Sequence, residues 1–354
     1  MTPALRIDSA ALRENLAVLR ARVAPAELML VVKDDAYGHQ VSRVVPVALG
    51  EGVSWIGAFD VATARAVRAV AGERTRIFVW MLPTRDEVAD AVALELDLGV
   101  GDVELLEDVA AVARVADATA RVHLKIDTGL HRNGIRPEEW EDVVRRAAEL
   151  QDGGTIEVVG VWSHIAEASD RDDDDARAAF DRALAEDLRA GLTPSLRHLA
   201  ASSAASARGE FRYDLVRVGA FAYGIAPAGG PTAADLGLTP VARLTAAVTG
   251  VDAAGVRIGI GSLHGLPSTL GGAVEVSTPS GRRRLLSVGP LESIVQAWDG
   301  AAPADEVVVY GDPAAGHVSA TALAEAIGTI GEEIATRVSP RVPRTDERPR
   351  LSPR

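Results

Sequence analysis

The sequence predicts an α/β protein with a (β/α)8 barrel of the TIM type, followed by a smaller C-terminal β domain. Three observations predict this fold. Short β-branched or Leu-rich runs alternate with amphipathic stretches from residue 8 to about residue 235. Polar residues gather at the downstream ends of those runs. Beyond residue 236 the pattern changes to short alternating runs separated by glycine.

Eight apolar runs are predicted to be strands. They lie at residues 27–33, 55–59, 76–80, 95–100, 121–127, 156–164, 196–201 and 215–219. Stretches between them, such as "VATARAVRAVA", carry apolar residues at three- and four-residue spacing, which predicts helices. Eight strand–helix pairs in this length favour a closed barrel over an open, doubly wound sheet, which stays open as the alternative.

The C-terminal third predicts a different architecture. Segments such as "GGAVEVSTPSGRRRLLSVG" predict antiparallel strands, and "SATALAEAIG" predicts a helix capped by Ser319. We expect the barrel at 8–235, the β domain at 236–340, and a flexible tail at 341–354, with residues 1–7 able to join the β domain. The acidic run in "SDRDDDDARAAF" is interpreted as the first turn of a helix, with a cation site as the alternative.

Composition limits the partners. No apolar run approaches the length of roughly 18 residues that a membrane span needs, and the N-terminus has no export signal, so we expect a cytoplasmic protein. The net charge of −13 argues against nucleic acid and anionic membranes and favours a small molecule. The chain has no cysteine, which excludes disulfides and thiolate metal sites, and no metal site is predicted.

Lys33 is one of only two lysines, and it stands at the end of a predicted apolar strand in "VVKDDAYGHQ". A desolvated lysine amine readily forms a Schiff base with a carbonyl compound. An ion pair with Asp34 or Asp35 is the structural alternative. Tyr37 adds a hydroxyl one turn later, and the glycine of "YGH" allows close backbone approach to a ligand.

Other polar residues end other predicted strands. The pairs are Lys125 with Asp127, Ser163 with His164, His198 with Ser202, and Arg217 with Gly219. In a parallel barrel the downstream ends of all strands share one rim, where active sites are built. The pattern therefore predicts one site to which five segments contribute.

Five ordered motifs resemble those of the alanine racemase family. They are "VVKDDAYGHQ", "VHLKIDTGLHRNGI", "GVWSHIAEAS", "RHLAASSA" and "LVRVGAFAYGI". The resemblance covers essentially the whole predicted barrel, and the fold that it implies is the barrel and β domain described above. It further implies a pyridoxal 5'-phosphate-dependent isomerase that acts on a small amino acid.

The resemblance also implies roles for single residues. Lys33 would form the Schiff base and act as the base on one face of the substrate Cα. Arg217 would face the pyridine nitrogen, with His198 behind it. The remaining cofactor-binding residues that it implies are Tyr37, His164, Ser202, Gly219, Ala220 and Tyr223. For His164 the alternative is a core histidine that contacts no cofactor.

A second lysine, Lys125, would be carbamylated according to the same resemblance. The resulting anion would orient Arg132 toward the cofactor oxygen and the substrate carboxylate, a pairing that suits a planar guanidinium. An ordinary Lys125–Asp127 pair is the alternative. Arginine could serve in such a pair, so the retention of lysine favours carbamylation.

The chain departs from the family pattern in the β domain. Racemisation needs a base on each face of Cα, and the family's second base is a tyrosine that a dimer partner supplies. Ile260 occupies that position here. His264 in the same loop is the one obvious titratable substitute, with a surface-loop histidine as the alternative. Glu332 replaces a tyrosine that binds phosphate, so that either its segment has moved or the phosphate is held more weakly, and Ala201 replaces an asparagine.

Three functions therefore stay open. The first is an isomerase whose second base has changed. The second is a one-sided reaction on another amino acid that uses Lys33 alone. The third is a cofactor-binding protein that does not racemise and pairs with an intact paralogue. The resemblance implies a homodimer for the first of these and a heterodimer for the last.

Overall fold

The computed structural model describes residues 3–166 and 169–347. The chain forms two compact units. The first unit comprises Leu19–Lys33 and Ala48–Gly219, and the second comprises Met1–Val18, Asp34–Val47 and Ala220–Arg354. The limits fall directly after Lys33 and directly after Gly219, so the candidate site residues are divided between the two units.

The first unit is a parallel barrel. Its sheet has the order β8-β7-β6-β5-β4-β3-β2-β9, and neighbouring strands pair in parallel. The strands are β2 (Glu27–Val31), β3 (Trp55–Asp60), β4 (Arg76–Met81), β5 (Asp97–Val100), β6 (Ala120–Lys125), β7 (Ile156–Trp162), β8 (Leu196–His198) and β9 (Leu215–Val218). Backbone bonds from Asp214 N to Arg197 O (3.1 Å) and from Arg217 N to Ala200 O (3.2 Å) join the last two strands. The sheet therefore closes, and the predicted barrel is confirmed.

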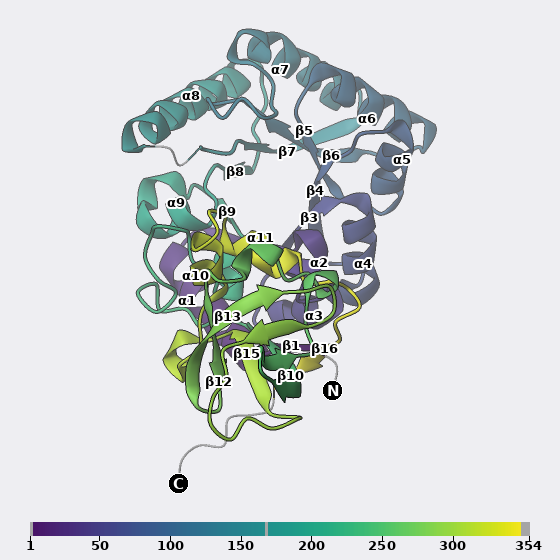
Figure 1. Cartoon of the computed structure of the whole chain (residues 1–354). Coiled ribbons are helices and arrows are strands. Elements are labelled where there is room, and N and C mark those ends of the chain that lie inside the picture. The colour runs from purple at the N-terminus through teal and green to yellow at the C-terminus, as the bar shows by residue number, and fades with distance from the viewer. Residues whose placement is uncertain (1–2, 167–168, 348–354) are drawn as a thin grey trace. The chain divides into compact units, whose positions relative to one another are not determined.

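Helices connect the strands, and Figure 1 shows α5–α8 on the outer side of strands β4–β8. They are α4 (Val61–Ala71), α5 (Arg85–Ala93), α6 (Val103–Val115), α7 (Pro137–Asp152), α8 (Asp170–Arg189) and α9 (Ser202–Ala207). Helices α1 (Ser9–Val23), α2 (Lys33–Tyr37) and α3 (Val41–Gly50) each cross a limit between the units.

Side-chain caps explain where several of these helices begin. Asp60, Thr84 and Asp102 accept a hydrogen bond from the backbone N–H three residues later. Ser169 caps α8 in the same way, and the acidic run "DRDDDD" forms the first turns of this helix. Carboxylates are favourable there because they meet the positive end of the helix dipole. The acidic run is therefore a helix start, as the sequence predicts.

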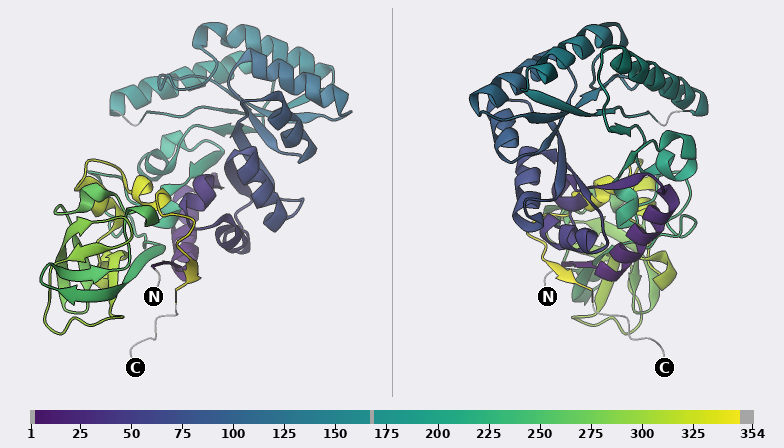
Figure 2. Two further views of the ribbon diagram at one scale, coloured as in Figure 1. Left: turned by 45° about the vertical axis from the view of Figure 1, so that its right-hand side comes forward. Right: turned by 180° about the vertical axis from the view of Figure 1, so that it is seen from behind.

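The second unit contains a mostly antiparallel sheet in the order β11-β14-β13-β12-β15-β10-β1-β16. Its strands are β1 (Ala4–Ile7), β10 (Ala242–Asp252), β11 (Gly255–Ile258), β12 (Glu275–Thr278), β13 (Gly281–Val288), β14 (Ser293–Val295), β15 (Glu306–Tyr310) and β16 (Arg344–Asp346). The strands between residues 242 and 310 lie side by side in both views of Figure 2. The predicted antiparallel β domain is thus confirmed.

Both ends of the described chain add strands to this sheet. Strand β1 pairs with β10, and β16 pairs in parallel with β1 within the segment where the sequence predicts a tail. The rest of that predicted tail, from residue 348, lies outside the described residues. Ser319 caps α10 (Ala320–Glu325) through a 3.0 Å bond from Ala322 N, as expected. A further short helix, α11 (Gly331–Thr336), follows.

Asp187 on α8 is a buried carboxyl, and neither of its oxygens has a hydrogen-bond partner among residues 3–166 and 169–347. Burial, and then the charge of Glu186, raises the pKa of Asp187 to about 7. As the pH rises, the unfolded carboxyl ionises before the folded one. The contribution of Asp187 to the free energy of unfolding is therefore fully present below the ordinary pKa of an aspartate and is lost as the pH rises through about 7.

Replacing Asp187 by leucine should therefore stabilise the protein. The expected gain in the free energy of unfolding is as much as about 4 kcal/mol at pH 8 and is smaller at pH 5. Urea unfolding of both proteins at the two pH values measures this difference. If the gain in the free energy of unfolding is the same at both pH values, burial does not raise the pKa of Asp187.

Candidate active site

Lys33 stands where β2 ends, and the backbone directly after it is unusual. Val32 N still pairs with Gly57 O of β3 at 2.9 Å. The four residues from Asp34 to Tyr37 then have φ between 53° and 57°, in the left-handed region. This conformation costs L-residues about 1–2 kcal/mol each and marks functional sites more often than ordinary loops. The turn directly adjoins the candidate Schiff-base lysine.

Tyr37 ends this left-handed turn and packs against a second tyrosine. Its ring centroid lies 5.0 Å from that of Tyr223, which in turn stacks on His39 at 4.7 Å. Burial raises the pKa of the Tyr37 hydroxyl, and the charges of Glu332 and Asp34 raise it further. Glu332, in the first turn of α11, therefore acts on Tyr37. Its charge reaches the Tyr37 hydroxyl, and the two alternatives for Glu332 stay open.

Arg217 is buried at the downstream end of β9. Its Nη1 donates to His198 Nδ1 (3.1 Å) and His198 O (2.8 Å). Its Nη2 donates to Ser163 O (2.6 Å) and Leu199 O (3.0 Å), and His164 Nδ1 lies 3.3 Å away. Burial, and then the charge of Arg132, lowers the pKa of Arg217 to about 9, so it stays protonated at neutral pH.

His164 and Ser202 lie on neighbouring segments of the rim. Burial, and then the charges of Arg217 and Arg132, lowers the pKa of His164 to about 3, so the imidazole is neutral. Ser202 Oγ accepts a 3.1 Å hydrogen bond from Gly219 N. Ala220, the next residue, opens the 3-10 turn Ala220–Tyr223. The structure thus brings Ser202 to Gly219, and His164 and His198 to Arg217. Of these contacts, the resemblance implies the one between His198 and Arg217.

Lys125 ends β6, and its side chain is buried. Its Nζ donates to Asn133 Oδ1 at 3.0 Å and lies 4.6 Å from the Trp162 ring centroid. Asp127 instead accepts from Gly129 N and from His131 N and Nδ1. The alternative in which Lys125 pairs with Asp127 through a hydrogen bond is therefore not observed.

The charge state of Lys125 follows from its surroundings. Burial, and then the charges of Arg217 and Arg132, lowers the pKa of Lys125 to about 8. Arg132 itself is exposed and follows this strand by a short loop. A lysine with this pKa holds an appreciable neutral fraction near pH 8, and only the neutral amine reacts with CO2.

The loop of the expected second base lies in the β domain. Ile260 is fully buried, and its carbonyl accepts a 2.6 Å hydrogen bond from Ser293 Oγ. His264 ends a short 3-10 turn, and its Nδ1 accepts from Gly261 N at 3.0 Å. A neutral histidine whose Nδ1 is an acceptor carries its proton on Nε2. This bond occupies the lone pair that a base would need.

Two contacts of the site were missed from the sequence. Asn133 is the partner of Lys125, and His123 lies behind His198 with His123 Nδ1 2.9 Å from His198 Nε2. A signal for His123 existed, because it precedes Lys125 by two residues in "VHLKID", and alternate residues of a strand face the same side. In the described ranges no cluster of three or more His, Asp or Glu residues could hold a metal ion. None of their helices is long and apolar enough to cross a membrane.

A closed parallel barrel with two lysines, a buried arginine and a serine–glycine pair at its strand ends defines a class of barrel enzymes that bind a phosphate-bearing aldehyde cofactor. Comparisons with known proteins give the family. The family model of the alanine racemase N-terminal domain matches residues 7–227, and that of the alanine racemase C-terminal domain matches residues 259–346.

Among the relatives, the alanine racemase of Beutenbergia cavernae is 37% identical, and the alignment covers 96% of each chain. Among the solved structures, the alanine racemase of Streptomyces lavendulae has a TM-score of 0.92 and 34% identity over 98% of this chain and 97% of that chain. That of Streptomyces coelicolor has a TM-score of 0.93 and 32% identity over 98% of each chain. The chain belongs to the alanine racemase family, whose enzymes use pyridoxal 5'-phosphate.

The residues present fit this cofactor. A guanidinium has five N–H donors, and the four on Nη1 and Nη2 of Arg217 meet protein acceptors. Among the described residues, every hydrogen bond of Arg217 comes from Nη1 or Nη2, which leaves the Nε–H as the donor for a ring nitrogen. Ser202 and Gly219, which bond to each other here, carry the hydroxyl and the backbone N–H that a phosphate would take up, and Lys33 carries the amine.

Proposed function

We propose that this protein is a pyridoxal 5'-phosphate-dependent amino-acid isomerase of the alanine racemase type with one intact base, Lys33, and a changed second base. The observation that carries the proposal is the hydrogen bonding of Arg217, at the end of β9. Its four Nη1 and Nη2 hydrogens bond to protein acceptors, and its Nε–H is available to a ligand. The bound cofactor would supply an electron-withdrawing ring that acidifies the Cα–H bond of an amino acid.

The chain's own residues would then hold and move protons. Lys33 would hold the cofactor through its amine, and the same amine, when free, would take the Cα proton on one face. Arg217, whose pKa is about 9, donates a hydrogen bond to the ring nitrogen without giving up its proton at neutral pH. His198 orients it from behind. Five residues would hold the phosphate end of the cofactor: Tyr37, Ser202, Gly219, Ala220 and Tyr223. His164 would pack beside the cofactor ring.

Lys125 and Arg132 would form the carboxylate-binding part of the site. In this proposal the neutral amine of Lys125 adds to CO2 and loses a proton, which gives a carbamate anion that orients Arg132. Mass spectrometry of the native protein in bicarbonate buffer at pH 8 should show the mass of one added CO2. The Lys125→Arg variant should show none, because a guanidinium does not react in this way. If both proteins, or neither, carry the mass of CO2 in addition to the mass of their own sequence, Lys125 is not carbamylated.

His264 is the candidate for the opposite face, although its bond with Gly261 N counts against it as a base. If His264 supplies the second proton, His264→Ala should slow inversion of alanine by about a hundredfold and leave cofactor binding unchanged. If inversion changes less than about twofold, His264 only supports its loop. The measurement is the rate at which each enantiomer converts into the other.

A one-sided reaction is the second candidate function. The buried Ile260 side chain has no proton to give, which favours chemistry at the Lys33 face alone. An intact paralogue that supplies the missing tyrosine would make this chain a heterodimer partner, and copurification with such a paralogue tests that arrangement. The proposal otherwise assumes a homodimer, a cytoplasmic location and the division into a barrel at 8–235 and a β domain at 236–340, to which β16, in the first part of the predicted tail, also belongs.

Absorbance spectroscopy tests the proposed function directly. Protein mixed with pyridoxal 5'-phosphate should show an absorption band that borohydride abolishes, because reduction converts the bond between Lys33 and the cofactor into a stable secondary amine. Peptide mapping should place the reduced adduct on Lys33. A protein without a band that borohydride removes would contradict the proposal.

A further inference from the structure

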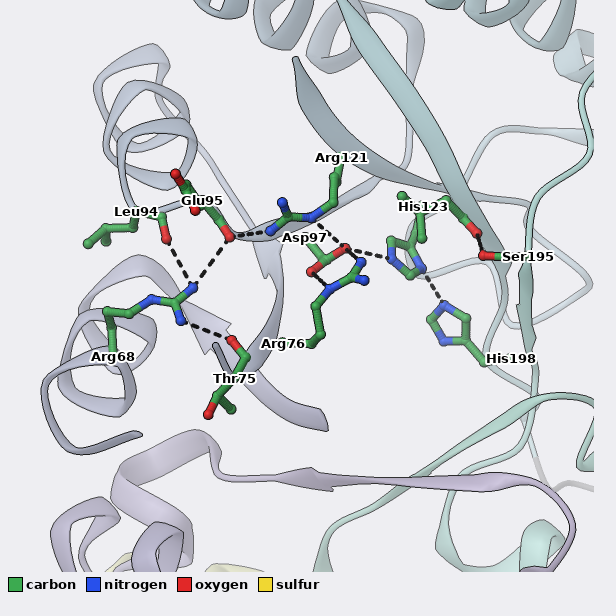
Figure 3. Close-up of polar contacts among 11 residues, drawn as sticks. Arg68, Thr75, Arg76, Leu94, Glu95, Asp97, Arg121, His123, Ser195 and His198 are labelled. Carbon is green, nitrogen blue, oxygen red and sulfur yellow. Dashed lines mark hydrogen bonds and ion pairs between the residues drawn. The ribbon is translucent and has the colours of Figure 1, made fainter. Parts of the chain in front are cut away.

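A row of buried polar side chains leads from Arg217 into the barrel. Arg217 Nη1 contacts His198 Nδ1 at 3.1 Å, and His198 Nε2 lies 2.9 Å from His123 Nδ1. His123 Nε2 in turn lies 3.4 Å from Asp97 Oδ1. Figure 3 shows the part of this row from Asp97 through His123 to His198. Asp97, His123 and His198 are all fully buried.

The row runs along the length of the barrel. Asp97 is the first residue of β5, His123 is in the middle of β6, and His198 and Arg217 are near the downstream ends of β8 and β9. It thus connects the upstream end of the barrel with the rim. Gly160 of β7 leaves room for it, since a Cβ there would lie 2.3 Å from His123 Nδ1.

Two arginines fix the charge at the upstream end. Arg76 donates from Nε to Asp97 Oδ2 at 2.9 Å and from Nη2 to Oδ1, and Arg121 Nε lies 3.3 Å from Oδ1 (Figure 3). Burial opposes ionisation, but the bonds from Arg76 and His123 prevail and lower the pKa of Asp97 to about 2. Asp97 is therefore an anion at neutral pH.

An ionised Asp97 sets the direction of every bond in the row. A carboxylate only accepts, so His123 must donate from Nε2. Burial lowers the pKa of His123 and of His198, so both rings are neutral and each carries one proton. His123 Nδ1 must then accept from His198 Nε2, and His198 Nδ1 must accept from Arg217. No other arrangement of protons satisfies all three contacts.

We propose that Asp97 and His123 are positioning residues for the proposed reaction: they fix the tautomer of His198, which holds Arg217 with its Nε–H free for the cofactor. Without the carboxylate, either ring can turn its proton toward its neighbour. A proton on His198 Nδ1 would oppose the N–H of Arg217 and displace the guanidinium. The assignment rests on the proposed function, but the tautomers themselves do not.

The first test uses the cofactor-free wild-type protein and involves no activity. Imidazole nitrogen NMR of protein labelled in its histidines should show His123 and His198 neutral at pH 7, each protonated on Nε2. A proton on Nδ1 of either ring in the wild-type protein would overturn the proposal, whatever the enzyme does.

The second test compares Asp97→Leu with Asp187→Leu, the same change at another buried aspartate outside the row. Asp97→Leu should remove the fixed tautomers, shift the absorption band of bound pyridoxal 5'-phosphate, and lower kcat about tenfold to a hundredfold with little change in KM. Asp187→Leu should retain the wild-type tautomers, absorption band and kcat. Gly160→Ala, which displaces His123 without changing a charge, should reproduce the first result.

These outcomes separate the possible failures. If Asp97→Leu and Gly160→Ala lower Tm but leave the tautomers and the absorption band as in wild type, the row is structural and the proposal is wrong. If Asp97→Leu does not fold, the proposal is tested by the Gly160→Ala variant and by the histidine tautomers of the wild-type protein. If the wild-type protein binds no pyridoxal 5'-phosphate, the proposed function fails, while the NMR measurement still shows whether Asp97 sets the tautomers.

Discussion

Lys33→Ala should abolish the absorption band that borohydride removes and strongly slow the exchange of the substrate Cα proton. The amine is the group that holds the cofactor's aldehyde carbon and also the base on one face. We expect exchange to fall by about a hundredfold to ten-thousandfold, the usual contribution of a positioned base. The band is measured by absorbance, and exchange by proton NMR in D2O.

The lysine-poor sequence makes this experiment unusually specific. Lys33→Ala leaves Lys125 as the only lysine in the chain, so a remaining reduced adduct can be assigned by peptide mapping. Lys33→Arg is the matched control, because it retains the positive charge but cannot bind the aldehyde. If either variant kept the absorption band, and peptide mapping placed the reduced adduct outside residues 27–37, Lys33 would not be the residue that binds the cofactor.

Arg217→Met should have the largest effect on stability. The change leaves His198 Nδ1 and the buried carbonyls of Ser163 and Leu199 without their donor, while the His198 carbonyl keeps its 3.2 Å bond from Ser163 N. Each unpaired buried group costs about 1–3 kcal/mol, so the free energy of unfolding should fall by at least about 3 kcal/mol. Cofactor affinity should fall as well, because the N–H for the ring nitrogen is lost. Urea unfolding and a cofactor titration measure the two effects.

Arg197→Met provides the matched control for Arg217→Met. Arg197 lies on β8 of the same barrel and pairs with Asp214, but its side chain is 47% exposed. Exposed ion pairs contribute about 0–1 kcal/mol, so this variant should unfold nearly like wild type and bind the cofactor normally. Similar losses in both variants would mean that Arg217 has no special place in the site.

The strand pattern made the barrel and the rim predictable. Residues such as Lys125 and Arg217 end apolar runs, and strand ends converge in any parallel barrel. The left-handed turn from Asp34 to Tyr37 was not predictable, because no residue in it is glycine and local preference disfavours that conformation. Only the surrounding tertiary structure can impose it.

The polar row inside the barrel could not be read from single segments either. Asp97 looks like an ordinary strand residue in "ELDLGV", and its role depends on the strand register that places it opposite Arg121. For His264, the folded structure weakens a role that the sequence suggested. The sequence makes it a candidate base, while its bond with Gly261 N emerges only from the folded turn.

The proposed site has one working base at Lys33 and a changed group on the opposite face. Exchange of the Cα proton of L- and D-alanine in D2O, followed together with inversion, tests it most directly. With one working base, one enantiomer should become deuterated with retention of configuration well before its mirror image accumulates. Exchange of neither enantiomer, or deuterium that enters both only as fast as they invert, would contradict it.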